Sequence, residues 1–261
     1  MTTDLVEVVR ERFRIFSSSY LEGTGSFFAY KIKIEHTYKV LERATDICHG
    51  DKLGQVVTLA SRLAALLHDV GRFPQYHEFK TFRDCNSVNH AALSVRHLLR
   101  ENMLEGVPIP IRRLATGAVF LHNVRFLPHN LSPEMLATVQ VVRDSDKLDI
   151  LRVMLEHFGR AQQEAPEVTL EAKDHPTNYT PAIAQAILNR QVSDYKSIVW
   201  VNDFKLLIAG WLYDLNTRTA CCILRNSGHL DALFALLPQD ETIGKVHAQI
   251  MSDLAQRVNG D

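Results

Sequence analysis

The residues with the clearest chemical potential in this 261-residue sequence are an adjacent histidine and aspartate, His68 and Asp69. They follow the apolar segment LAALL, which is expected to end a buried helix. Burying an imidazole beside a carboxylate is unfavourable unless the two are paired or bind a metal ion. Because neighbouring helical residues point about 100° apart, the two side chains cannot share one helix face. They can still hold one metal from two sides, or Asp69 can bridge two metals.

Four further candidate ligands lie in other predicted helices. His36 is in the middle of one helix, His90 is at the start of another, His122 is near the end of a third, and Asp146 is within a fourth. In a helical bundle, such positions can converge on one point in the core. Mixed imidazole and carboxylate ligands suit Fe, Mn, Zn or Co rather than Ca or Mg. Together with the His-Asp pair, these residues predict a buried metal centre.

The elements that must position these ligands are predicted to be helices, because apolar residues recur with helical period and Gly or Pro stands at most boundaries. We therefore predict an all-α fold. The expected helices span 5–16, 27–48, 52–70, 89–103, 111–123, 133–159, 181–190, 201–215, 217–237 and 240–257. Residues 72–87 are predicted to form a loop. We expect one domain over 1–261, with a metal-bearing bundle at about 27–159 and a helical extension at about 160–261.

Composition narrows the range of partners. Lys and Arg total 29 and Asp and Glu total 30, so the net charge is −1 and no overall basic field favours nucleic acid or an anionic membrane. No apolar run approaches the roughly 20 residues of a spanning helix. The four cysteines form no C-x-x-C pair, and the N-terminus lacks a signal-peptide pattern. We expect a cytoplasmic protein that binds neither nucleic acid nor membrane; its oligomeric state stays open.

Taken in order, the ligand candidates carry a family resemblance. His36, His68-Asp69 and Asp146 reproduce the H…HD…D pattern of the HD-domain metal-dependent phosphohydrolases. His90 and His122 are similar to the additional histidines of dinuclear members. The fragment HDVGRFPQYHEFKTFRDCNSVNHA and the segments WLYDLN and HLDALFALLP resemble a little-characterised bacterial group of HD-domain proteins. The resemblance thus covers nearly the whole chain and implies an HD-type helical bundle.

The resemblance implies two divalent metal ions per chain, with Fe or Mn favoured and Zn, Co, Ni or Mg as alternatives. The implied ligands are His36, His68, Asp69 and Asp146 for the first ion, and Asp69, His90 and His122 for the second. The implied activity is hydrolysis of a nucleotide or another small phosphate ester by a metal-activated hydroxide, with Asp69 as a catalytic residue.

Basic residues near the motifs are candidates for contacting substrate phosphate. They are Arg72, Lys80 and Lys147, of which Arg72 and Lys147 are also catalytic candidates. Single-metal HD nucleotidases and guanosine-tetraphosphate hydrolases carry Glu where this chain has Arg72, which argues against their catalytic arrangement. The chain also lacks the Gly-Tyr-Pro motif of HD-type cyclic-di-GMP phosphodiesterases.

Two alternatives for Arg72 and its neighbours stay open. An ion pair of Arg72 with Asp69 or Asp84 is as well supported as its contact with substrate. Asp84 or Asp149 is a candidate for orienting a ligand histidine from behind.

Two other functions are compatible with the same ligand set. One is a mixed-valence di-iron oxygenase of the HD type that cleaves carbon–carbon or carbon–phosphorus bonds. The other is a catalytically silent nucleotide-binding module with a structural metal.

Overall fold

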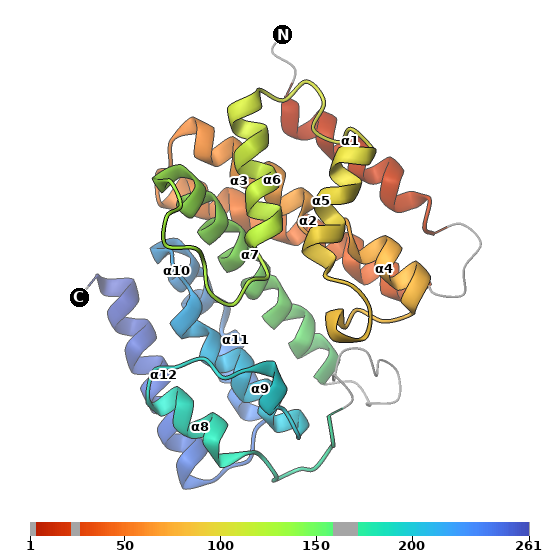
Figure 1. Ribbon diagram of the computed structural model, residues 1–261. Coiled ribbons are helices and arrows are strands. Elements are labelled where there is room, and N and C mark those ends of the chain that lie inside the picture. The colour runs from red at the N-terminus through yellow and green to blue at the C-terminus, as the bar shows by residue number, and fades with distance from the viewer. Residues whose placement is uncertain (1–3, 22–26, 159–171, 261) are drawn as a thin grey trace. The chain divides into compact units, whose positions relative to one another are not determined.

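A computed structural model of the chain describes residues 4–21, 27–158 and 172–260. The fold is all-α, as the sequence predicts (Figure 1). Within the described ranges, extended backbone pairing is limited to one isolated parallel bridge between Lys173 and Trp200. The chain divides into two compact units, Met1–Asp149 and Ile150–Asp261. The boundary between the units falls within one long helix, α7 (Pro133–Phe158). The number of domains, expected to be one, stays a prediction.

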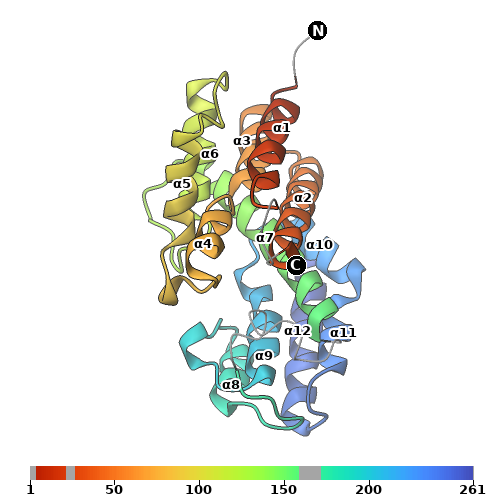
Figure 2. The same ribbon diagram turned by 90° about the vertical axis from the view of Figure 1, so that its right-hand side faces the viewer.

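The first unit is built around a central apolar helix. Its helices are α1 (Leu5–Ser18), α2 (Phe27–Gly50), α3 (Gln55–Leu67), α4 (Arg72–Phe79), α5 (His90–Arg100), α6 (Ile109–Leu121) and the first part of α7 (Pro133–Phe158). Helix α3 packs against α1, α2 and α6, and α5 lies beside α6 (Figures 1 and 2). From Leu63 to Leu67, α3 is apolar on all sides and buried in the unit; Leu63, Leu66 and Leu67 are inaccessible to solvent.

An aromatic cluster fixes α4 directly behind the His-Asp pair. The buried ring of Phe73 stacks on Tyr30 of α2 with centroids 6.0 Å apart. The same ring packs edge-on against Phe13 and Phe16 of α1, at 5.9 and 6.0 Å. Such aromatic contacts stabilise a core beyond simple area burial. Two helices thereby hold the start of α4, and with it the turn that follows α3.

Two helix predictions need correction. Residues 72–87 are not one loop, because α4 occupies Arg72–Phe79 and a short 3₁₀ turn occupies Asp84–Asn86. Pro74 does not prevent α4, since proline is tolerated in the first turn of a helix. The single helix expected at 217–237 is two, α10 (Arg218–Ser227) and α11 (His229–Ala235). Gly228 separates them because its φ of +67° is left-handed.

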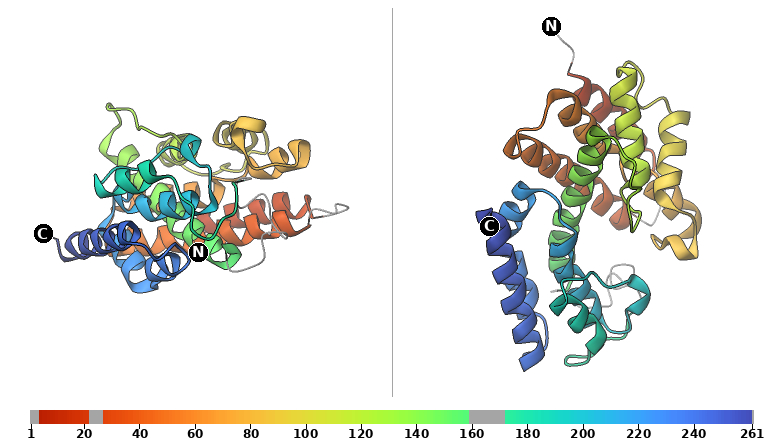
Figure 3. Two further views of the ribbon diagram at one scale, coloured as in Figure 1. Left: turned by 90° about the horizontal axis from the view of Figure 1, so that it is seen from below. Right: turned by 60° about the vertical axis from the view of Figure 1, so that its left-hand side comes forward.

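The second unit is also helical. It contains α8 (Pro181–Leu188), α9 (Val201–Gly210), α10, α11 and α12 (Glu241–Asn259), with 3₁₀ turns at Tyr195–Ser197 and Trp211–Asp214. Helix α12 packs along α8 and α10 (Figure 3). Residues 159–171, which include the start of the expected extension, lie outside the described residues. In the part of the chain that the structure describes, no helix is both long and apolar enough to cross a bilayer.

A buried carboxylate ties α12 to the rest of this unit. Asp253 accepts hydrogen bonds from Arg190 Nε at 2.9 Å, Tyr213 Oη at 2.9 Å and Gln249 Nε2 at 2.8 Å. Burial alone would raise the pKa of Asp253, but the hydrogen bonds from Arg190, Gln249 and Tyr213 outweigh it and lower the pKa. The ionised carboxylate is therefore the form that the folded unit favours.

We predict that Asp253→Asn lowers the free energy of unfolding by about 1–3 kcal/mol at pH 7, the usual effect of spoiling a buried charged acceptor. Because the folded pKa lies below the unfolded value of about 3.9, this contribution is complete above that pH and is lost as the pH falls through the folded pKa. Urea unfolding at several pH values measures it. A difference between wild type and variant that stays constant down to pH 2.5 would contradict this account.

Candidate metal centre

The six residues predicted as metal ligands all lie together in the first unit. His36 comes from α2, His68 ends α3, and Asp69 follows in the turn before α4. His90 is the first residue of α5, and His122 ends α6. Asp146 lies in α7. Five helices thus converge on one point, as the spacing predicts. Asp146 is partly exposed, whereas the other five side chains are buried.

The turn that carries the His-Asp pair is pinned to α5 by a serine. Ser94 Oγ accepts a hydrogen bond from the Gly71 amide at 2.8 Å and donates one to the His68 carbonyl at 2.7 Å. The backbones approach so closely that a Cβ at Gly71 would overlap the His90 carbonyl and the Ser94 amide. Glycine at 71 therefore sets the distance between Asp69 and His90.

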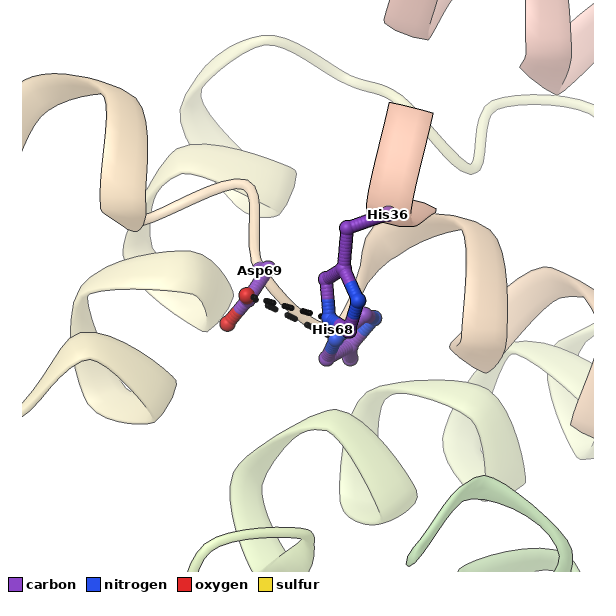
Figure 4. Close-up of side chains that lie close together, drawn as sticks. All are labelled: His36, His68 and Asp69. Atoms are coloured by element: carbon purple, nitrogen blue, oxygen red, sulfur yellow. Dashed lines mark ion pairs between the residues drawn. The ribbon is translucent and has the colours of Figure 1, made fainter. Parts of the chain in front are cut away.

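The first group of donors surrounds one oxygen of Asp69. Asp69 Oδ2 lies 3.8 Å from His36 Nε2 and 3.6 Å from His68 Nε2 (Figure 4). Asp146 Oδ1 lies 3.1 Å from His36 Nε2 and 3.6 Å from His68 Nε2. Among the residues that the structure describes, neither Nε2 atom has a hydrogen-bond partner, although both atoms are buried. Two buried imidazole nitrogens without partners beside two carboxylates match the donor set of a divalent metal.

The second group of donors surrounds the other oxygen of Asp69. Asp69 Oδ1 lies 3.6 Å from His90 Nε2. His90 Nε2 in turn lies 3.1 Å from His122 Nε2. The donor atoms of Asp69, His90 and His122 all lie within 4.8 Å of one another, as do those of Asp69, His36 and His68. Asp69 therefore takes part in both groups, with one oxygen turned to each.

All four histidines are oriented through Nδ1. His68 Nδ1 donates to the Ala65 carbonyl at 2.8 Å, and His122 Nδ1 donates to the Val119 carbonyl at 2.7 Å. His36 Nδ1 lies 2.7 Å from Asp149 Oδ2, and His90 Nδ1 lies 2.7 Å from Asp84 Oδ2. Both predicted supporting contacts, from Asp84 and from Asp149, are thus present. Holding Nδ1–H in this way leaves each Nε2 free to bind a metal.

The Nε2 atoms of His90 and His122 face each other, and their distance and protonation show whether one metal ion can bind both. Burial and the charge of Arg72 lower the pKa of His90. Burial and the neighbouring imidazoles of His90 and His68 lower the pKa of His122 to about 3, so both rings are neutral near pH 7. With their protons on Nδ1, two lone pairs face each other at 3.1 Å, which is repulsive unless a cation lies against both. Two ligand atoms that share a metal at about 2.1 Å from each are separated by roughly 3.0–3.4 Å, so the geometry fits.

The carboxylates of the centre are held in the charged form. Burial would raise the pKa of Asp69, but Lys33, His68 and Arg72 lower it well below its usual range. Burial would likewise lower the pKa of His36, but the nearby carboxylates of Asp146 and Asp149 raise it to about 9. Carboxylates that favour a positive charge on an imidazole also favour a metal cation at the same place.

The three basic residues predicted to contact phosphate have different surroundings in the structure. Arg72 donates to Asp84 Oδ1 and Gln75 Oε1 at 2.9 Å, and its Nε lies 3.5 Å from Asp69 Oδ1. Arg72 thus pairs with both aspartates considered for it. Lys80 ends α4 in a left-handed conformation and is exposed; no ion pair joins it to another described residue. Lys147 follows Asp146 on α7 and is half-buried.

Sequence reasoning missed one charged residue of the centre, Lys33. Its Nζ lies 2.7 Å from Asp69 Oδ2 and 5.4 Å from the ring centroid of Phe82. The signal was available, because Lys33 stands three residues before His36 and residues three apart share a helix face. Ser94 carried no comparable signal, since its role depends on the contact between α5 and the turn before α4.

The sequence of the chain also matches a protein-family model. Residues 34–179, more than half of the chain, match the model of the HD domain. The chain belongs to the HD domain family. HD domains bind divalent metals and are generally metal-dependent hydrolases, and the buried His/Asp groups described above could hold such a metal. Searches of curated proteins and of solved structures gave no match to this HD domain protein.

We predict that Gly71→Ala destabilises the HD domain by about 1–3 kcal/mol, because the added methyl forces the turn away from α5. Gly54→Ala is the matched control: a Cβ there meets no atom within 4 Å, so stability should change by less than about 1 kcal/mol. Thermal unfolding of both variants measures the effect. Equal melting temperatures would contradict the packing that we assign to Gly71.

Proposed function

We propose that this HD domain protein is a metal-dependent phosphohydrolase with two divalent ions per chain, Fe or Mn being favoured. We further propose that its substrate is a nucleotide or another small phosphate ester. One observation carries the proposal: the two oxygens of Asp69 face two separate groups of histidine nitrogens. A carboxylate shared in this way is suited to bridging two metals, with His36, His68 and Asp146 on one side and His90 and His122 on the other.

When bound, two divalent ions supply a nucleophilic water at neutral pH and neutralise charge on the phosphoryl oxygens. The residues of the chain orient the donors. Nδ1 hydrogen bonds fix each imidazole, and the carboxyl groups of Asp84 and Asp149 do this for His90 and His36.

Arg72 has a positioning role in this proposal. Its guanidinium joins Asp84, which supports His90, to Asp69, which belongs to both donor groups. Contacts of Arg72, Lys80 and Lys147 with substrate phosphate remain predictions.

The experiment that tests the proposal compares Asp69→Asn with the wild type. We expect the wild type to bind about two Mn or Fe per chain and to hydrolyse phosphate esters. The variant should lose most of the metal and at least about a thousandfold in kcat/KM, because both metals lose a ligand. Asp231→Asn, which removes an exposed carboxylate of the second unit that pairs with His247, is the control and should change neither quantity.

Three results would contradict the proposal. The first is a wild type that binds no metal after reconstitution. The second is turnover that requires oxygen and a mixed-valence di-iron centre. The third is recovery of intact nucleotide, and of other small phosphate esters, after long incubation with metal-loaded protein. The second result would favour the oxygenase alternative, and the third would favour a silent nucleotide-binding module.

The supporting aspartates allow the two proposed metals to be separated. Asp84→Asn should lower the affinity for the ion at His90 and His122 by about 10–100-fold. Asp149→Asn should lower the affinity for the ion at His36 and His68 by a similar factor. Isothermal titration with Mn²⁺ measures both steps. If each variant lowered the affinity of both sites equally, the division into two donor groups would be wrong.

A further inference from the structure

The ammonium paired with Asp69 contacts the carboxylate oxygen that a metal in the first donor group would bind. Lys33 Nζ contacts Asp69 Oδ2, and this is the oxygen that faces His36 and His68. A divalent ion bound by these donors would lie roughly 2.0–2.2 Å from the same oxygen. The ammonium and the metal would then share one carboxylate oxygen in a buried setting, where like charges repel strongly.

The two cations that flank Asp69 are held very differently. Arg72 is fixed by Gln75, the Phe82 carbonyl and Asp84, in addition to its proximity to Asp69. Among the described residues, the Lys33 ammonium has one hydrogen-bond acceptor, Asp69, and otherwise lies against the ring of Phe82. Arg72 is therefore part of the framework, whereas Lys33 can leave by breaking one ion pair.

Side-chain chemistry fits a departing lysine. A lysine carries a compact charge on a flexible four-carbon stem, unlike the rigid fork of arginine. The Lys33 side chain is 18% exposed, whereas its partner Asp69 is only 4% exposed. The ammonium therefore has access to water that the carboxylate lacks.

We propose that Lys33 is an exchangeable counter-ion of Asp69 that a divalent metal displaces from the first donor group. The inference rests on the proposed function, because it assumes that Asp69, His36 and His68 bind a metal. Lys33 neutralises Asp69 before the metal arrives and so keeps a buried charge paired. The metal then competes with the ammonium for Asp69, and this competition lowers the affinity of the site for the metal.

The test measures Mn²⁺ affinity of Lys33→Met by isothermal titration at neutral pH. Methionine keeps the approximate length of the stem and removes the charge. Displacement predicts binding about tenfold tighter than in the wild type, because no ion pair has to be broken. A lysine that instead stays in place and orients Asp69 predicts binding weakened by about 10–100-fold, and that result would overturn the inference.

Lysine acetylation of the wild type, quantified by mass spectrometry, gives a second readout. Modification of Lys33 should rise when Mn²⁺ is added, because the ammonium leaves Asp69. Lys39 is the control, since it lies on the same helix, pairs with Glu42 and should react equally with and without metal. Unchanged or lower reactivity of Lys33 with metal would also overturn the inference. Failure of both wild type and variant to bind Mn²⁺ would instead contradict the proposed function itself.

Discussion

The rest of the centre depends on one carboxylate, that of Asp69. It is almost completely buried, and in that environment an unpaired charge would be very costly. Lys33 and Arg72 balance it, one near each oxygen, while histidines from four helices present nitrogens to it. One buried carboxylate thus contacts two cations and faces both groups of imidazoles.

The packing of the first unit fixes the position of the Asp69 carboxylate. Asp69 lies in a turn between α3, whose last five residues are buried, and α4, which is fixed by the aromatic contacts of Phe73. Ser94 and Gly71 join the turn to α5, and this contact also places His90. Rigid positioning of this kind is what a metal site needs, because ligand atoms must lie within a few tenths of an ångström of their places.

The sequence predicted the fold class because helical periodicity is a local signal. It predicted the six candidate ligands because His36, His68-Asp69 and Asp146, with His90 and His122, resemble the HD-domain pattern in their order along the chain. It did not predict α4, since Gly71 and Pro74 resemble a helix end and only packing of Phe73 reveals a helix there. Lys33 and Ser94 were missed because a lysine or serine is chemically ordinary until a tertiary contact gives it a partner. The contacts of Arg72 were left open for the same reason, and the structure shows that it pairs with both Asp69 and Asp84.

The central claim is that Asp69 is shared between two metal ions, and anomalous diffraction from crystals of the Mn²⁺-loaded protein tests it most directly. The account predicts two anomalous peaks about 3.5–4 Å apart, on either side of the Asp69 carboxylate, one against His36 and His68 and the other against His90 and His122. A single peak, or two peaks of which one lies away from Asp69, would contradict it.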